Sequence, residues 1–149
     1  DSFVMDLARN CEHAKLPYLE NISPETLHQL YKCIVGESVM CGLDFMAIKK
    51  ETVHAFLDFI GIDYRNERVI SNRNVEILKD SYHDEIAHYD LVHIFEGFIH
   101  IAFEVRPDED NEYCRIKIEL IENEEALNRA KKSPTAEGWS RVRVDVYPE

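Results

Sequence analysis

The chain has 149 residues, of which 45% are hydrophobic and 31% charged, and its 29 acidic against 17 basic side chains give a formal net charge of −12. This length is typical of a single domain with its own core, here residues 1–149, and the composition excludes a fibrous or largely disordered chain. The negative charge disfavours nucleic acid and anionic membranes as partners and favours a cationic partner.

Helical spacing dominates the first half of the sequence. Apolar residues recur every three or four positions from Ser2 to Ala14. The run Ser23-Pro24-Glu25 supplies an N-cap, a proline at the first helical position and an acidic first turn, which predicts a second helix. A third helix is expected to end near Ile60, because Gly61 follows it, and Val75, Leu78 and Tyr82 favour a fourth helix over about 73–85.

From Tyr89 onward the apolar period changes from helical to alternating, which predicts strands. The segment LVHIFEGFIHIAFEV is interpreted as a hairpin with a two-residue turn at Glu96-Gly97, a register that places His93 directly opposite His100. The face expected to line the core carries Val92, Ile94, Ile99, Ile101, Phe103 and Val105.

Two later segments, residues 114–120 and 142–146, also alternate, with a short helical stretch and a loop between them. The sequence therefore predicts an α+β fold in which three or four N-terminal helices (about 2–85) pack on one face of a C-terminal four-stranded antiparallel sheet (about 89–147). The other face is expected to stay partly wet. It would present Tyr89, Leu91, His93, Phe95, Phe98, His100, Arg115, Lys117, Glu119, Arg141, Arg143 and Tyr147.

The four cysteines, Cys11, Cys33, Cys41 and Cys114, have no CxxC spacing and lie within apolar patterns. Buried reduced thiols explain them better than disulfides or a zinc site, which favours the cytoplasm. No stretch is apolar enough for a membrane span, and the first 15 residues carry charges where a signal peptide needs an apolar run.

The best indication of chemistry is the pair His93 and His100, which the hairpin register sets close enough to share a proton or a metal. A metal would need a third ligand, for which only Glu104 or Tyr89 is available, so no metal or cofactor is expected. The nucleotide-binding and nucleophile motifs are missing from the sequence, and no catalytic residue is assigned. The alternative interpretation is two strand histidines without a catalytic role.

Acidic side chains cluster in two places in the second half of the sequence. The residues expected to bind a partner are Asp108, Glu109, Asp110 and Glu112, between two strands, and Glu122, Glu124 and Glu125, after the next strand. They would form one rim if both segments lay at the same end of the sheet. Glu124 and Glu125 can equally well stabilise a helix N-terminus.

Three functional hypotheses follow. The first is a non-enzymatic binding protein with a basic partner, most concretely a bacterial immunity protein or antitoxin that neutralises a nuclease-like toxin. The second is a small enzyme or ligand carrier that uses His93 and His100 on a concave open sheet face. The third is a structural or oligomerisation domain, because Leu91, Phe95 and Phe98 would leave an apolar patch exposed. A homodimer is compatible with all three.

Overall fold

The computed structural model describes residues 2–16, 22–36, 39–62, 75–83, 88–105 and 113–132. Its helices are α1 (Ser2–Asn10), α2 (Pro24–Val35), α3 (Lys50–Phe59) and α4 (Glu124–Lys132). Its strands are β1 (His13–Leu16), β2 (Gly42–Lys49), β3 (Val75–His83), β4 (His88–Glu96), β5 (Ile99–Val105) and β6 (Tyr113–Leu120).

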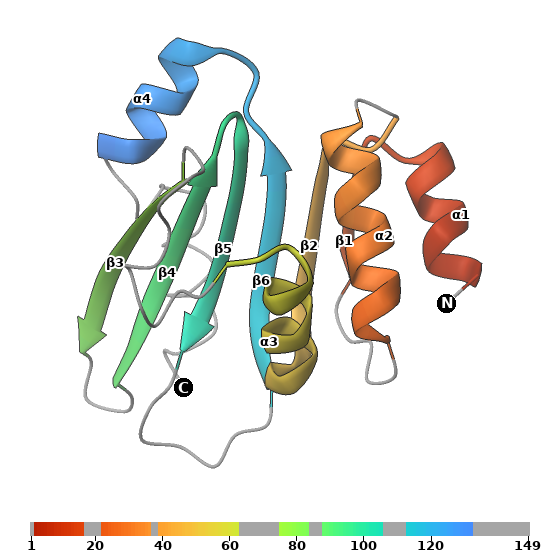
Figure 1. Ribbon diagram of the computed structural model, residues 1–149, viewed down its shortest axis with the longest axis horizontal. Coiled ribbons are helices and arrows are strands. Elements are labelled where there is room, and N and C mark those ends of the chain that lie inside the picture. The colour runs from red at the N-terminus through yellow and green to blue at the C-terminus, as the bar shows by residue number, and fades with distance from the viewer. Residues whose placement is uncertain are drawn as a thin grey trace.

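The strands form one mixed sheet in the order β1-β2-β6-β5-β4-β3, in which β1 and β2 are parallel and all other neighbours antiparallel. Helices α2 and α3 pack against β2 and β6, and α1 lies beside α2 (Figure 1). We call the sheet face that they cover the core face. Helix α4 follows β6 and packs on the opposite face, which we call the polar face because His93, His100, Arg115, Lys117 and Glu119 lie on it.

The predicted α+β class is confirmed, but the predicted architecture is wrong. The sheet has six strands rather than four and includes a parallel pair. Three of its strands, β1, β2 and β3, come from the half of the sequence that was expected to be helical, and one helix, α4, comes from the other half. The strand expected at residues 142–146 lies outside the described residues.

Strand β2 was missed because a bulge disrupts its alternation. Leu43, Phe45 and Ile48 all point into the core, and the register shifts between Phe45 and Ile48. The extra residue of a bulge converts a spacing of two into a spacing of three, which looks helical. The first predicted helix was too long. It ends at Asn10, and Ala14, which continued the apolar spacing, packs against the main core from β1.

The segment predicted as a fourth helix is the edge strand β3. Its side chains are divided between two apolar clusters, because Val75 and Ile77 pack against the main core while Leu78 packs against the cluster under α4. A strand that has apolar contacts on both faces does not alternate cleanly. The spacing of Val75, Leu78 and Tyr82 was therefore misleading.

The hairpin between β4 and β5 is present, but its turn lies one residue later than predicted. Glu96 pairs with Ile99, so the turn residues are Gly97 and Phe98, and His93 faces Ala102 instead of His100. Gly97 has φ 60°, the positive value that the two-residue turns of types I′ and II′ both require at the first central position. Moving the turn by one residue changes each pairing by two positions, so every side chain keeps its predicted face.

Several local predictions are confirmed. Helix α2 starts where the sequence indicated, with Ser23 Oγ accepting a hydrogen bond from the Thr26 amide at 3.1 Å. Gly61, with φ 74°, follows the end of α3. The expected core-face residues of the hairpin are buried in the main cluster, Val105 excepted, because its side chain is not described. Among the described helices, none is long and apolar enough to cross a membrane.

Replacing Ser23 with alanine tests the capping interaction. Ser23→Ala removes the acceptor for the Thr26 amide and is expected to lower the free energy of unfolding by about 1 kcal/mol. Ser23→Asp keeps an acceptor and is expected to lose less than half as much. Urea unfolding of both variants measures the difference, and equal losses would contradict a capping role for the hydroxyl.

Candidate functional site

Three neighbouring strands place ionisable side chains in one hydrogen-bonded chain on the polar face. His100 of β5 pairs directly with Glu119 of β6, while His93 of β4 is its diagonal neighbour across the hairpin. Diagonal neighbours on one sheet face lie within reach of long or aromatic side chains. The predicted proximity of the two histidines is therefore confirmed, although the predicted register that led to it was wrong.

The hydrogen-bonded side chains lie at short distances from one another. His93 Nδ1 lies 3.0 Å from His100 Nε2, and His100 Nδ1 lies 3.0 Å from Glu119 Oε1. Lys117 Nζ lies 3.5 Å from the other carboxylate oxygen of Glu119. The two imidazole planes are inclined by only 12°, and the Phe95 ring stacks on His100 at a centroid distance of 4.4 Å. These contacts fix the orientation of both rings.

Burial and hydrogen bonding shift the pKa values of the two end groups, Glu119 and His93. Burial raises the pKa of Glu119, but the hydrogen bond to His100 and the ammonium of Lys117 outweigh it, so the pKa lies below its usual value. Burial, reinforced by His100, lowers the pKa of His93 to about 3. A charged Glu119 has no proton to donate, so His100 Nδ1–H donates to the carboxylate.

The open face predicted for these histidines is not observed. His93 is 1% and His100 4% exposed, and Leu91 and Phe95 are also buried. Leu127 and Ile121 cover Phe95, so α4 accounts for part of this burial. The expected partly wet face is present only over β6, where Lys117 and Glu119 are each 32% exposed. The burial near Phe95 was not anticipated, because no local pattern indicates that α4 folds back over the sheet.

One polar atom in this cluster has no partner. His93 Nε2 is buried and makes no hydrogen bond in the described part of the chain. Both nitrogens of His100 are already hydrogen-bonded, so the two rings do not jointly present free ligand atoms. The described residues contain no group of three His, Cys, Asp or Glu side chains arranged to hold a metal ion.

A buried ion pair that sequence reasoning missed lies on the same face. Arg115 of β6 donates to Asp44 of β2 through Nη2 at 2.6 Å and through Nε at 3.1 Å. The side chains are 5% and 15% exposed. A bidentate pair of this kind is among the stronger charged hydrogen bonds. Its partners are 71 positions apart, so no local pattern could have linked them.

The acidic residues predicted to bind a partner are placed only in part. Glu122, Glu124 and Glu125 are exposed at the connection from β6 to α4. Asp108, Glu109, Asp110 and Glu112 lie outside the described residues. The segment 106–112 joins the end of β5 to the start of β6, and the pairing of Ile99 with Leu120 puts those strand ends opposite the end where α4 begins (Figure 1). The idea of one shared rim at a single end gains no support from this topology.

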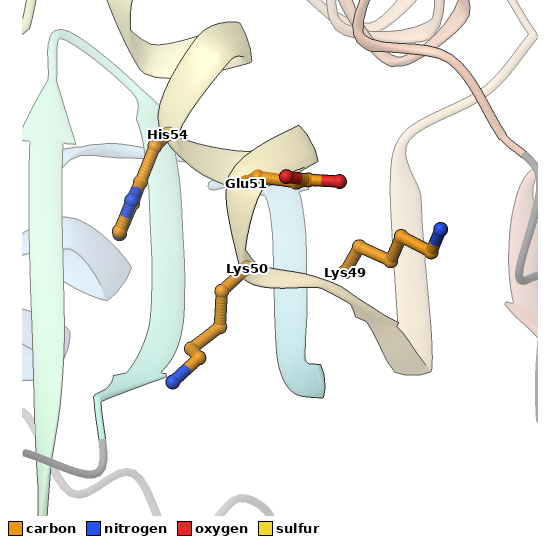
Figure 2. A pocket seen from close by; sticks show the side chains of 4 residues that line it. All are labelled: Lys49, Lys50, Glu51 and His54. Atoms are coloured by element: carbon orange, nitrogen blue, oxygen red, sulfur yellow. The ribbon is translucent and has the colours of Figure 1, made fainter. Parts of the chain in front are cut away.

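Two surface cavities involve described residues. The larger, about 390 Å³, lies where β2 passes into α3 and is lined by Lys49, Lys50, Glu51 and His54. Figure 2 shows that Lys50 and His54 extend to one side, whereas Lys49 and Glu51 extend to the other, so the two ammonium groups do not converge. The smaller, about 210 Å³, lies over β1, β2 and β6 and includes Glu119 in its wall.

All four cysteines are free thiols. Cys114 is buried as expected, whereas Cys11, Cys33 and Cys41 are only partly buried. Burial, together with the Glu104 carboxylate, raises the pKa of the Cys114 thiol to about 12, which keeps it protonated and unreactive.

Comparisons with protein-family models, with curated proteins and with solved structures found no match for this chain. The functional argument therefore depends on the geometry alone.

The low pKa of His93 makes folding pH-dependent. Below its ordinary pKa of 6.5 the unfolded chain binds a proton at His93 that the folded chain does not bind until about pH 3. Stability is therefore retained above pH 6.5 and lost as the pH falls from there toward 3. We expect this residue to remove about 2 kcal/mol from the free energy of unfolding between about pH 7.5 and about pH 5.

Urea unfolding at these two pH values measures the effect. His93→Gln has no titrating ring but keeps a donor for His100, so its stability should change less with pH than that of the parent. His13→Gln is the matched control, because the His13 side chain is 70% exposed. A His93→Gln variant with the same pH dependence as the parent would sink this account.

The buried ion pair predicts a second effect on stability. Asp44→Ala leaves the Arg115 guanidinium without this carboxylate and is expected to cost about 3 kcal/mol. The double variant Asp44→Leu with Arg115→Met removes both charges and is expected to recover most of that loss. Chemical unfolding of the two variants and the parent provides the comparison. A double variant less stable than Asp44→Ala alone would contradict it.

Proposed function

We propose that this chain is a non-enzymatic protein that binds a basic protein partner, most concretely an immunity protein or antitoxin that covers a nuclease-like toxin. The observation that carries the proposal is a cluster of three exposed carboxylates, those of Glu122, Glu124 and Glu125, which we call the acidic corner. Within the described part of the chain, none of the three takes part in an ion pair. Their charges are available to a partner.

The charge of the whole chain supports the same partner class. With a net charge of −12, the molecule attracts cationic proteins over distances of about 10 Å at moderate ionic strength. Exposed charges at the margin of an interface mainly raise the association rate, whereas buried contacts determine dissociation. We therefore propose that the acidic corner speeds association with the partner and orients it.

Part of this charge also has a structural role. Glu124 and Glu125 lie in the first turn of α4, and Asn123 caps the helix by accepting from the Ala126 amide at 2.9 Å. Acidic groups at a helix N-terminus stabilise it by about 0.3–1 kcal/mol each. Glu122 precedes the helix and has no such role, so its exposed charge is the cleaner indication of binding.

The catalytic alternative loses support from the burial of the histidines. An acid or base must touch its substrate, but His93 and His100 are almost fully buried and hydrogen-bonded to one another. The oligomerisation alternative loses support as well, because Leu91 and Phe95 are covered within the chain. Phe98 alone of that predicted patch is exposed, at 45%.

The experiment combines capture with kinetics. The tagged chain is used to retain proteins from a lysate of its native cells, and the retained basic protein is then produced alone for binding kinetics at several salt concentrations. We expect a fixed-ratio complex whose association rate falls at least about tenfold from low to high salt. Neutralising the acidic corner with Glu122→Gln, Glu124→Gln and Glu125→Gln should slow association several-fold.

Glu25→Gln is the matched control, because Glu25 is an exposed first-turn acid of another helix, α2. Melting temperatures of the variants separate helix stability from binding. Retention of no basic protein would overturn the proposal. Equal association rates for the triple variant and the Glu25→Gln control would remove the acidic corner from it.

A further inference from the structure

We propose that the cavity over β1, β2 and β6 binds a small oxyanion, a molecule with a carboxylate or phosphate group, which goes beyond the binding of a protein partner. The cavity has a volume of about 210 Å³. It has room for inorganic phosphate or a small dicarboxylate. Its wall consists of His13, Ala14, Lys15, Gly42, Leu43, Asp44, Lys117 and Glu119.

The strand register explains why a cavity forms here. His13, Gly42 and Glu119 are consecutive cross-strand neighbours in one row of the polar face, and Gly42 contributes no side chain between the other two. The His13 ring lies against this position, since a Cβ on residue 42 would come within 2.6 Å of His13 Nδ1. The glycine therefore allows the imidazole to form one wall of the cavity.

The hydrogen-bonding groups still available in the wall favour an anion, because its carboxylates already have partners. Asp44 accepts both hydrogen bonds from Arg115, and Glu119 accepts from His100. The lysines are less occupied. Lys15 is exposed and has no ion pair within the described part of the chain, and Lys117 is only loosely paired with Glu119 at 3.5 Å.

The wall itself has two ammonium groups, those of Lys15 and Lys117, and two carboxylates, those of Asp44 and Glu119. Because Arg115 and His100 already donate to the carboxylates, the ammonium groups are the charged groups left to meet a ligand. The other cavity also has two lysines, but their side chains diverge (Figure 2). We therefore assign the anion to the site over Gly42.

Binding in the cavity should change the NMR signals of His100, although His100 does not touch the ligand. An oxyanion that takes up Lys117 withdraws a cation from Glu119, and the carboxylate then holds the His100 Nδ1 proton more strongly. His100 is buried and does not line the cavity, so a change in its ring-nitrogen signal cannot come from direct contact with the ligand.

The test is an NMR titration of the ¹⁵N-labelled full chain with inorganic phosphate and, separately, with succinate, with chloride adjusted to hold ionic strength constant. We expect saturable shifts of the His100 ring nitrogens and of the amides of Gly42 and Lys117. The tighter of the two probes identifies the preferred head group. Shifts that grow linearly without saturation, or that chloride reproduces, would overturn the proposal.

Variants locate the site. Lys15→Met removes an exposed charge that holds no described contact and should weaken binding at least threefold, while Lys15→Met with Lys117→Met should weaken it at least tenfold. Lys49→Met with Lys50→Met removes the same charge from the other cavity and should leave the affinity unchanged. Amide spectra without ligand verify that each variant is folded. Loss of binding in the Lys49 and Lys50 variant, with retention in the Lys15 and Lys117 variant, would place the anion elsewhere and refute the assignment.

Discussion

The pairing of β2 with β6 is the interaction on which the rest of the structure depends. Strand β6 has β5, β4 and β3 on one side, and β2 with β1 on the other, so this single ladder joins the two halves of the sheet. The same register places Ile116 and Ile118 beneath α2 and α3 and turns Arg115, Lys117 and Glu119 to the opposite face. The helical core, the ion pair with Asp44 and the contact with His100 all follow from it.

Where both faces of the sheet are covered, its buried polar groups must be satisfied internally. An unpaired polar group in the interior costs more than its hydrogen bond would contribute, and an unpaired charge costs more still. The polar face meets most of this requirement with the bidentate contact of Arg115 to Asp44 and the hydrogen bonds of His100. Two buried atoms are exceptions in the described region, because His93 Nε2 and Arg115 Nη1 make no hydrogen bond there. Burial, reinforced by His100, lowers the pKa of His93 and keeps the ring neutral.

Sequence reasoning succeeded where the determinants are local. Ser23-Pro24 and Gly61 define helix ends through contacts within a few residues, and the alternation along β5 and β6 assigned their side chains to the correct faces. It failed where the determinants are distant. The bulge in β2 concealed a strand whose partner lies about 70 positions later, and the two apolar clusters around β3 removed its alternation.

The candidate sites show the same division. The sequence identified His93 and His100 as neighbours, because both lie in one hairpin and face parity survives a shifted turn. It could not identify Glu119 as the third member, nor Asp44 as the partner of Arg115, because those contacts need the order of strands in the sheet. The cavity over Gly42 was invisible for the same reason, since its wall comes from three segments separated along the chain.

The long separation between β2 and β6 also determines the order in which the protein can assemble during synthesis. At about 5–20 residues per second, the ribosome needs roughly 3–13 s to extend the chain from Lys49 to Tyr113. Until then β1, β2 and the first three helices have an apolar sheet face and an open strand edge but no central strand to complete them. The protein is consequently most prone to aggregation while only its amino-terminal half has been synthesised. Synthesis of β6 ends this period, because β6 pairs with the open edge of β2.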